Sequence, residues 1–411
     1  MGGKGAGRGA GRQLMAFGAP RSAFEEAAAS RQQPASTEAD RSSALTAEVD
    51  RPGWTEFVPR RWLRNGHLQT IAGNFLPRRL VLPEPQTLLV EVDGPVAGYG
   101  PSQVLCHCHW QPEEVRRQRL TVVLVHGLEG SSQSKYIVGN AARALAAGLN
   151  VVRMNMRTCG GTDHLSPTIY HSGRSGDVGR VVETIVREQG LESVAIAGYS
   201  MGANLVLRWA GELSERLDRA DSDGVGGPGH QPLREVKALV GISPLMDLAA
   251  SSAALHRPQN RMYQWHFLKS MIARVRRRMA MYPRIYADAA VGRIHSMRDF
   301  DQEIVARYGG FADADDYYYS VASSKYAGAL RVPTLIVHSA DDPFIRMLPE
   351  TREALIVNPH VTLIETEHGG HCAFLAPSTA AGDDGRWAEA TLLGFLMDRS
   401  GGIDLGVPRG G

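Results

Sequence analysis

The chain has 411 residues, 43% of them hydrophobic, and its 45 basic and 43 acidic residues leave a formal net charge of +2 at pH 7. This composition supplies enough apolar surface for a sizeable core and excludes a largely disordered chain. The near-zero net charge gives no electrostatic reason to expect a nucleic-acid partner.

The two ends of the chain differ from the rest. The first twelve residues, MGGKGAGRGAGR, include six glycines, and no apolar period is sustained before residue 50. We expect a disordered low-complexity leader over 1–50 and a flexible tail over 401–411. The leader has four basic residues before its first acid, Glu25, which is also compatible with an organellar transit peptide.

The compartment is predicted from the cysteines and the hydropathy. Four cysteines are too few for a disulfide scaffold and suit a reducing environment. No run of about 18 apolar residues occurs, so no transmembrane helix is expected. These features predict an intracellular protein, either cytoplasmic or organellar.

Short β-branched runs alternate with helical periods between the two ends. Seven runs are predicted to be strands, and they begin at Thr87, Thr121, Asn150, Ser193, Lys237, Pro333 and Val361. Helices are predicted over 136–147, 177–188, 201–216 and 386–397. This alternation predicts an α/β fold with a mostly parallel, doubly wound sheet.

Residues 247–330 break the alternation, because they contain helical signals and no clear strand. An insertion between two late strands lies at the carboxyl edge of a parallel sheet, where ligands bind, so we expect a helical lid. Its segment from Arg257 to Arg307 has eleven basic and four acidic residues, an excess of seven positive charges.

One helix of this lid is predicted to be amphipathic. Its apolar residues repeat with helical spacing, at Leu268, Met271, Ile272, Val275 and Met279, and its basic residues Lys269, Arg276 and Arg277 fall on the other face. Such a helix can pack its apolar face over a site, lie on an anionic lipid surface, or do both.

One motif carries the chemistry. Gly198-Tyr199-Ser200-Met201-Gly202 matches G-x-S-x-G, follows a predicted strand and opens a predicted helix. This is the setting of a nucleophile elbow, whose sharp turn needs small residues on both sides of the serine. The helix that starts behind Ser200 favours negative charge. Ser200 is therefore the candidate nucleophile.

A serine hydroxyl needs a base, and the base needs an acid that orients it. Asp341 and Asp342 closely follow the strand that begins at Pro333, and His368 and His371 follow the next strand. Both pairs stand at carboxyl ends of strands, the edge where Ser200 lies. The order Ser, Asp, His is one of the known orders of catalytic triads. The residues themselves leave the choice within each pair open.

An oxyanion hole is expected from the loop after the strand that begins at Thr121, together with the residue after the nucleophile. Gly127 and Gly130 let the backbone of that loop approach a substrate. The backbone N–H groups of Leu128 and Met201 are the candidate oxyanion donors.

The sequence motifs give little support for a metal-binding or nucleotide-binding site. In Cys106-His107-Cys108-His109, neighbours along a short strand point to opposite faces, so the four side chains cannot share one metal ion. His368 and His371 lie in a Gly-Gly turn without a helical frame. No G-x-x-x-x-G-K-[ST] motif occurs, which excludes a P-loop. We expect no metal ion and no cofactor.

The motifs together resemble the esterase branch of the α/β-hydrolase fold, with its mammalian α/β-hydrolase domain lipases, fungal medium-chain ethyl-ester synthases and plant embryogenesis-associated hydrolases. The resemblance covers about residues 54–398, and its pieces occur in the family's order. These pieces are NGHLQT from Asn65, HGLEGSS from His126, RTCGGTD from Arg157, YHSG from Tyr170, GYSMGAN from Gly198, ADDYYYS from Ala314, SADDPF from Ser339 and EHGGHCAF from Glu367. One departure is Gly66, where the family usually has proline.

The resemblance implies roles for residues that the motifs left open. It makes Ser200 the nucleophile, Asp342 the acid and His371 the base. It implies short- to medium-chain ester, acylglycerol or phospholipid substrates and no cofactor. Some members of the family it points to act as acyltransferases.

The sequence therefore predicts one α/β-hydrolase domain over 51–400, with its lid at about 247–330. The expected activity is that of a serine esterase or lipase, which acts on a small ester or lipid through an acyl-enzyme. One alternative is an acyltransferase, in which an alcohol outcompetes water. Another is a non-catalytic, membrane-associated binding protein that keeps the fold.

Overall fold

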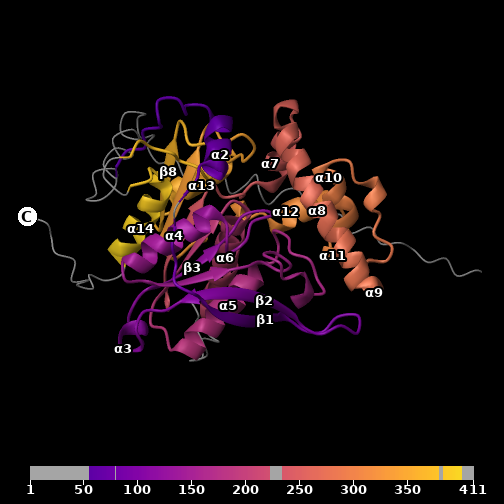
Figure 1. Ribbon diagram of the computed structural model, residues 1–411, viewed down its shortest axis with the longest axis horizontal. Coiled ribbons are helices and arrows are strands. Elements are labelled where there is room, and N and C mark those ends of the chain that lie inside the picture. Colours follow the sequence, from indigo (N-terminus) through magenta and orange to yellow (C-terminus); the bar gives the residue numbers. More distant parts are fainter. Residues whose placement is uncertain (1–54, 79, 223–233, 379–382, 400–411) are drawn as a thin grey trace, which may run out of the picture. The chain divides into compact units, whose positions relative to one another are not determined.

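The computed structural model describes residues 55–78, 80–222, 234–378 and 383–399 (Figure 1). The leader predicted over 1–50 and the tail predicted over 401–411 lie outside the described residues. None of the helices in the described part of the chain has the length and hydropathy of a transmembrane span.

The described strands form one sheet. They are β1 (Gln86–Asp93), β2 (Ser102–His109), β3 (Thr121–Val125), β4 (Asn150–Met154), β5 (Val194–Tyr199), β6 (Val236–Ile242), β7 (Thr334–Ser339) and β8 (Val361–Thr366). Their order across the sheet is β1-β2-β4-β3-β5-β6-β7-β8. β2 pairs antiparallel with β1 and β4, and all other pairs are parallel. The predicted mostly parallel sheet is confirmed, and β2 begins four residues before the short strand expected at Cys106.

The helices around the sheet follow the predicted periods. The four expected helices correspond to α4 (Lys135–Ala146), α5 (Ser175–Gln189), α6 (Met201–Ser222) and α14 (Trp387–Arg399). Outside the insertion, the structure adds α2 (Gly66–Phe75), α3 (Glu113–Arg116) and α13 (Pro349–Val357). Helix α2, which the periodicity did not predict, begins directly after the N-cap Asn65.

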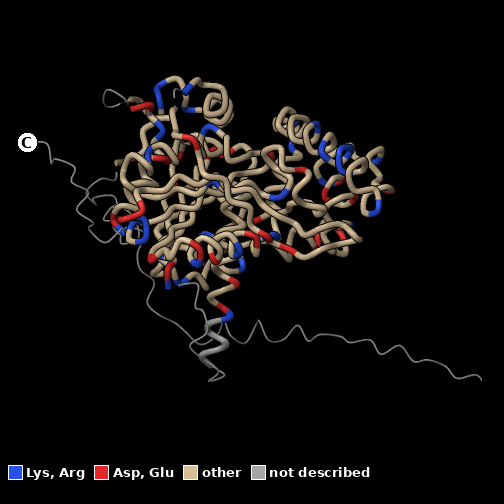
Figure 2. Tube along the Cα trace, turned by 60° about the horizontal axis from the view of Figure 1, so that its bottom comes forward, with Lys and Arg blue, Asp and Glu red and all other residues tan. Residues whose placement is uncertain are grey.

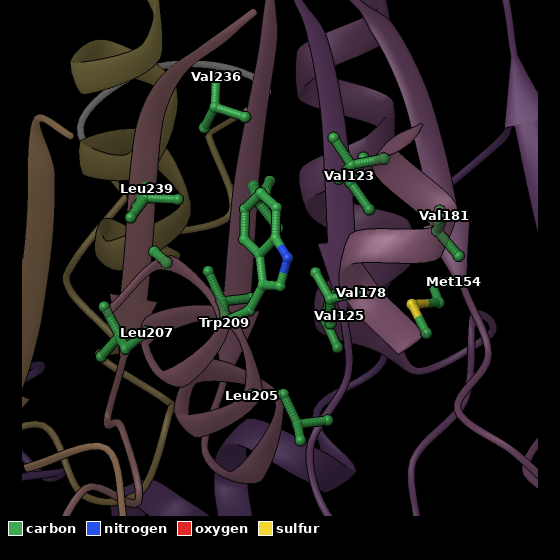
Figure 3. Close-up of a cluster of buried hydrophobic side chains, with 14 of the residues drawn as sticks. Val123, Val125, Met154, Val178, Val181, Leu205, Leu207, Trp209, Val236 and Leu239 are labelled. Carbon is green, nitrogen blue, oxygen red and sulfur yellow. The ribbon is translucent and has the colours of Figure 1, made fainter. Parts of the chain in front are cut away.

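Apolar side chains cover both faces of the sheet. On one face, α5 and α6 pack against alternate residues of the parallel strands, such as Val123 and Val125 (Figure 3). On the other face, α4 and α14 cover the intervening residues, such as Val122 and Leu124. Strand side chains alternate between faces, so a strand covered on both sides is apolar throughout.

A glycine lets the two helices of the first face approach closely. A Cβ atom at Gly179 in α5 would overlap the indole ring of Trp209 in α6. Trp209 is buried within the cluster drawn in Figure 3. This packing holds the helix that follows Ser200 against the sheet.

Between β6 and β7 the chain forms a helical insertion, defined here as residues 247–330. It contains α7 (Leu248–Leu255), α8 (Arg261–Met281), α9 (Pro283–Tyr286), α10 (Met297–Phe300), a π-helix (Asp301–Ala306), α11 (Arg307–Gly309) and α12 (Ala314–Val321). These helices gather on one side of the sheet, at the right in Figure 1. Their apolar side chains form a cluster that also includes Ile169, Phe344 and Ile345 from outside the insertion.

Helix α8 has the two faces that its sequence predicts. Met271 and Val275 are buried in the cluster of the insertion, and Leu268, Ile272 and Met279 are half-buried. Lys269, Arg276 and Arg277 are exposed. Basic residues stand out along the insertion in Figure 2.

Candidate active site

Ser200 stands at a strained turn between β5 and α6. Its backbone has a φ of +54°, which a residue with a side chain rarely adopts. A Cβ at Gly198 would lie 2.5 Å from the backbone nitrogen of Ala203, and one at Gly202 would overlap the carbonyl oxygen of His126. Both glycines are therefore needed for the turn, which has the geometry of a nucleophile elbow.

Three predicted residues meet at this turn. Nε2 of His371 lies 3.0 Å from Oγ of Ser200, and Nδ1 of His371 lies 2.8 Å from Oδ2 of Asp342. The Asp342 carboxylate accepts a hydrogen bond and so assigns the ring proton to Nδ1, which leaves Nε2 free to accept the Ser200 hydroxyl proton. The second oxygen of Asp342 accepts the backbone N–H groups of Phe344 and Ile345.

The surroundings of Asp342 favour its ionised form. Burial by itself raises the pKa of Asp342, but His371 and the hydrogen bonds to the carboxylate lower it below its usual range. Burial by itself lowers the pKa of His371, but Cys372 and Asp342 beside the ring raise it well above its usual value. The ring is therefore a stronger base than a free histidine.

The other members of the two candidate pairs lie apart from Ser200. Asp341 accepts the backbone N–H of Gly370 at 2.8 Å, and its second oxygen lies 3.5 Å from Nδ1 of His368. The structure brings Asp342 and His371 to the serine, and Asp341 and His368 to the neighbouring loop.

Two contacts that sequence reasoning missed hold the histidine loop. Oγ1 of Thr70 in α2 accepts the backbone N–H of His371 at 2.8 Å and donates to the carbonyl of Gly66. Oγ of Ser243 accepts the backbone N–H of Cys372 at 3.1 Å. Thr70 lies in the NGHLQT piece, which was the available signal, whereas nothing in the sequence distinguished Ser243.

The loop after β3 runs beside the serine. A Cβ at Gly127 would lie 3.1 Å from Cβ of Ser200, so the close approach depends on glycine. In the part of the chain that the structure describes, the backbone N–H groups of Leu128 and Met201 have no hydrogen-bond partner. Both residues line the cavity described below, so these two N–H groups are available to an oxygen atom of a ligand.

His126 shapes this loop without taking part in the triad. Its Nε2 accepts the backbone N–H of Met156 at 3.1 Å, so its Nδ1 donates to the carbonyl of Gly127 at 2.8 Å. Burial lowers the pKa of His126 to about 4, and the ring is therefore neutral near pH 7.

A cavity of about 340 Å³ opens beside Ser200 and His371. Helix α2, the loop after β3 and the helical insertion all line it. Most of the insertion's contribution is apolar or aromatic, and includes Leu248, Leu255, Phe267 and Met297. One exception is Asp301, which accepts the hydroxyl of Tyr318 at 2.7 Å. Burial raises the pKa of Asp301 to about 7.

The cysteine-histidine run in β2 divides between two faces, as predicted. Cys106 and Cys108 are buried in the core. His107 contacts Oγ of Ser132, and His109 contacts the guanidinium of Arg153. Among the described residues, no group of three or more His, Cys, Asp or Glu side chains could hold a metal ion.

Comparisons with known proteins agree with this architecture. A family profile described as the alpha/beta hydrolase fold matches residues 121–377. The candidate esterase YheT of Escherichia coli is 31% identical over 324 residues, which cover 78% of this chain and 87% of YheT.

Two further relatives are more distant. Phospholipase ABHD3 of Bos taurus is 26% identical over 62% of this chain and 59% of its own length. The monoacylglycerol lipase of Saccharomyces cerevisiae is 22% identical over 67% of this chain and 58% of its own length. With its sheet order, its serine turn and the match to the family profile, the chain belongs to the α/β-hydrolase fold family.

Proposed function

We propose that this protein is a serine hydrolase that cleaves short- to medium-chain carboxylic esters derived from lipids. The observation that carries the proposal is the hydrogen-bonded series from Ser200 through His371 to Asp342, at 3.0 and 2.8 Å. In this assignment Ser200 is the nucleophile, His371 the base and Asp342 the orienting acid.

The proposed reaction has two halves. His371 removes the hydroxyl proton as Oγ of Ser200 attacks the ester carbonyl, and the N–H groups of Leu128 and Met201 stabilise the oxyanion. The tetrahedral intermediate collapses, His371 protonates the leaving alcohol, and an acyl-enzyme remains. Water then attacks the acyl group by the same route in reverse and releases the carboxylic acid.

The cavity supports the proposed substrate size. Its volume of about 340 Å³ lies at the small end of the range for ligand sites, and much of its wall is apolar. The named activities of ABHD3 and the yeast monoacylglycerol lipase support a lipid ester as the substrate.

Active-site labelling tests the proposal. A fluorophosphonate probe should label the wild-type protein and leave Ser200→Ala unlabelled, because the probe reacts only with an activated serine. Ser252→Ala is the matched control, since Ser252 lines the same cavity and contacts Tyr318 rather than His371. Labelling of Ser200→Ala at the wild-type rate would refute the assignment.

Hydrolysis of p-nitrophenyl acetate, butyrate, octanoate and palmitate should then define the acyl preference. The small cavity predicts that palmitate is the poorest substrate. Product analysis with added ethanol separates hydrolysis from acyl transfer, since only transfer forms an ethyl ester.

We also propose that the exposed face of α8 contacts an anionic lipid surface. Trp265 and Met262 are 63% and 56% exposed, and the Lys269 ammonium lies 5.2 Å from the centre of the Trp265 ring. Aromatic and basic side chains on one face are typical of helices that bind membrane interfaces.

Sedimentation with lipid vesicles tests this contact. The protein should sediment with phosphatidylglycerol-containing vesicles more than with pure phosphatidylcholine vesicles. Trp265→Ser combined with Lys269→Gln should reduce that binding. Equal sedimentation of the variant and the wild type would argue against the contact.

A further inference from the structure

We infer that Glu129 and Arg274, which form an ion pair, are positioning residues. Through this pair, helix α8 holds the loop after β3 (residues 126–132, here called the oxyanion loop) in the geometry that turnover needs. The inference rests on the proposed function and extends it to the insertion. Glu129 directly follows Leu128, whose backbone N–H is a proposed oxyanion donor.

The conformation of Glu129 is unfavourable for its residue type. The backbone N–H of Gly130 donates to the carbonyl of Gly127, which closes a turn with Leu128 and Glu129 at its centre. Glu129 has a φ of +56°, at the turn position where glycine is normally favoured. A glutamate at this position needs a compensating interaction, and that interaction comes from its side chain.

Three side chains hold the Glu129 carboxylate. Oε1 accepts the Tyr170 hydroxyl at 2.5 Å and the Arg274 guanidinium at 2.9 Å, and Oε2 accepts the Ser270 hydroxyl at 2.5 Å. Ser270 and Arg274 lie one helical turn apart in α8. The carboxylate is therefore fixed mainly by a helix that follows it by about 140 residues.

Arg274 holds a second strained residue at the same time. Its guanidinium donates to the carbonyl and hydroxyl of Thr158, whose φ is +65°. It also lies over the ring of Tyr170, 5.1 Å from the ring centre. One side chain thus ties the loop after β3 and the loop after β4 to α8.

The ion pair is shielded from water. The side chains of Arg274 and Glu129 are only 12% and 10% exposed. Removal of either side chain would leave the other charge in this shielded site without its counter-ion, which is unfavourable, so the pair resists separation. Further along α8, Arg278 donates to the carbonyl of Ser166, and Tyr282, directly after the end of the helix, donates to that of His164.

These contacts give α8 two roles, because it lines the cavity and also positions the oxyanion loop. Tyr263 and Phe267 of α8 line the cavity, and Arg274 of the same helix holds the oxyanion loop. Displacement of α8 would open the cavity and release Glu129 together. Turnover should therefore require α8 in its docked position, because oxyanion donors act only when they are aimed at the developing charge.

Steady-state kinetics of the wild type and five purified variants test the inference. The variants are Glu129→Gly, Glu129→Gln, Arg274→Gln, the Glu129→Gly/Arg274→Gln double variant, and the control Arg307→Gln. Arg307 forms an exposed ion pair with Asp288 in the same insertion and does not line the cavity. Glycine suits the turn, so Glu129→Gly removes the side-chain anchor without adding backbone strain.

The expected result is a loss of turnover rather than of binding. With p-nitrophenyl butyrate, kcat of Glu129→Gly and Arg274→Gln should fall by about 10- to 100-fold, and KM should stay within about threefold. The Glu129→Gln side chain keeps an oxygen that accepts hydrogen bonds, so the kcat of this variant should fall less. The double variant should lose less kcat than the product of the two single losses, because both substitutions break the same ion pair. The control should keep its kcat within about twofold.

The inhibition constant of a trifluoromethyl ketone separates a positioning role from a purely structural one, because a purely structural role would leave this constant unchanged. The ketone forms a tetrahedral oxyanion with the serine, so its inhibition constant should rise in proportion to the loss of kcat. If Arg274→Gln does not fold, Arg274→Lys and Glu129→Gly make the same test.

A folded Glu129→Gly variant with wild-type kcat would overturn the inference, as would additive losses in the double variant. An unchanged ketone inhibition constant beside a lowered kcat would also overturn it. The proposed function fails by a different result, which is activity in Ser200→Ala.

Discussion

The carboxylate of Asp341 accepts the backbone N–H of Gly370 at 2.8 Å, one residue before His371. Its neighbour Asp342 reaches the His371 ring instead, also at 2.8 Å. Two adjacent aspartates therefore bind the same loop at different points, one at the backbone and one at the imidazole.

This division predicts different results for two matched substitutions. Asp342→Asn should lower turnover by about 10³- to 10⁴-fold, because an amide cannot enforce the tautomer that leaves Nε2 unprotonated. Asp341→Asn should keep activity within about tenfold, because its amide oxygen still accepts the Gly370 N–H. The measurement is kcat of both variants after circular dichroism shows that they are folded. An inactive Asp341→Asn would reverse the assignment, and two active variants would place the acid elsewhere.

The pH profile should follow the histidine base. His371 accepts a proton only when it is neutral, and its pKa is raised well above the ordinary value of about 6.5. Activity should therefore rise with pH and reach half its maximum above about pH 6.5. The kcat/KM profile of the free enzyme reports this midpoint. A midpoint at or below the ordinary histidine value would contradict the raised pKa.

Asp301 should make stability depend on pH. Burial raises its pKa to about 7, whereas in the unfolded chain it titrates near 3.9. The folded state keeps the proton, so the stabilisation is complete below about pH 4 and is lost as pH rises through about 7. Asp301→Asn should raise the free energy of unfolding at pH 8 by about 1 to 3 kcal/mol and change it little at pH 4.

Urea denaturation at the two pH values measures this difference. Glu367→Gln is the control, because its side chain is 87% exposed and its stability should follow the wild type at both pH values. A less stable Asp301→Asn at pH 8 would mean that the ionised carboxylate stabilises the fold.

Gly66 should tolerate no larger residue. A Cβ there would overlap the carbonyl oxygen of Asp341, so α2 would have to shift and Thr70 would lose its contact with the His371 backbone. Gly66→Ala should cost about 1 to 3 kcal/mol of stability and lower kcat by about tenfold or more. Thermal unfolding and ester hydrolysis measure the two effects.

Gly176→Ala is the control for this substitution. Gly176 lies in α5, and a Cβ there would meet no atom within 4 Å. Alanine is the better helix former, so this variant should be as stable as the wild type or slightly more stable. Wild-type stability and activity in Gly66→Ala would show that α2 moves without cost.

The fold could be predicted from the sequence because the patterns that specify each strand and helix lie within that one element. β-branched runs such as Thr121–Val125 and helical periods such as that of α6 occur within one element, and their alternation specifies a parallel sheet. The same holds for Ser200, whose flanking glycines, preceding strand and following helix are all adjacent in the chain. Helix α2 escaped prediction because its apolar period is short, although Asn65 caps it.

The remaining features of the site depend on contacts between distant segments. Apart from the family resemblance, no local pattern separates Asp342 from Asp341 or His371 from His368, since the direction of a loop side chain is set by what packs around it. Gly66 beside Asp341 and Arg274 beside Glu129 are joined only after the sheet brings their loops to one edge. Local sequence patterns were enough to specify the parallel sheet, the serine turn and the chain order of the candidate triad residues. Tertiary packing decided which side chains meet, because it alone aligns segments separated by more than a hundred residues.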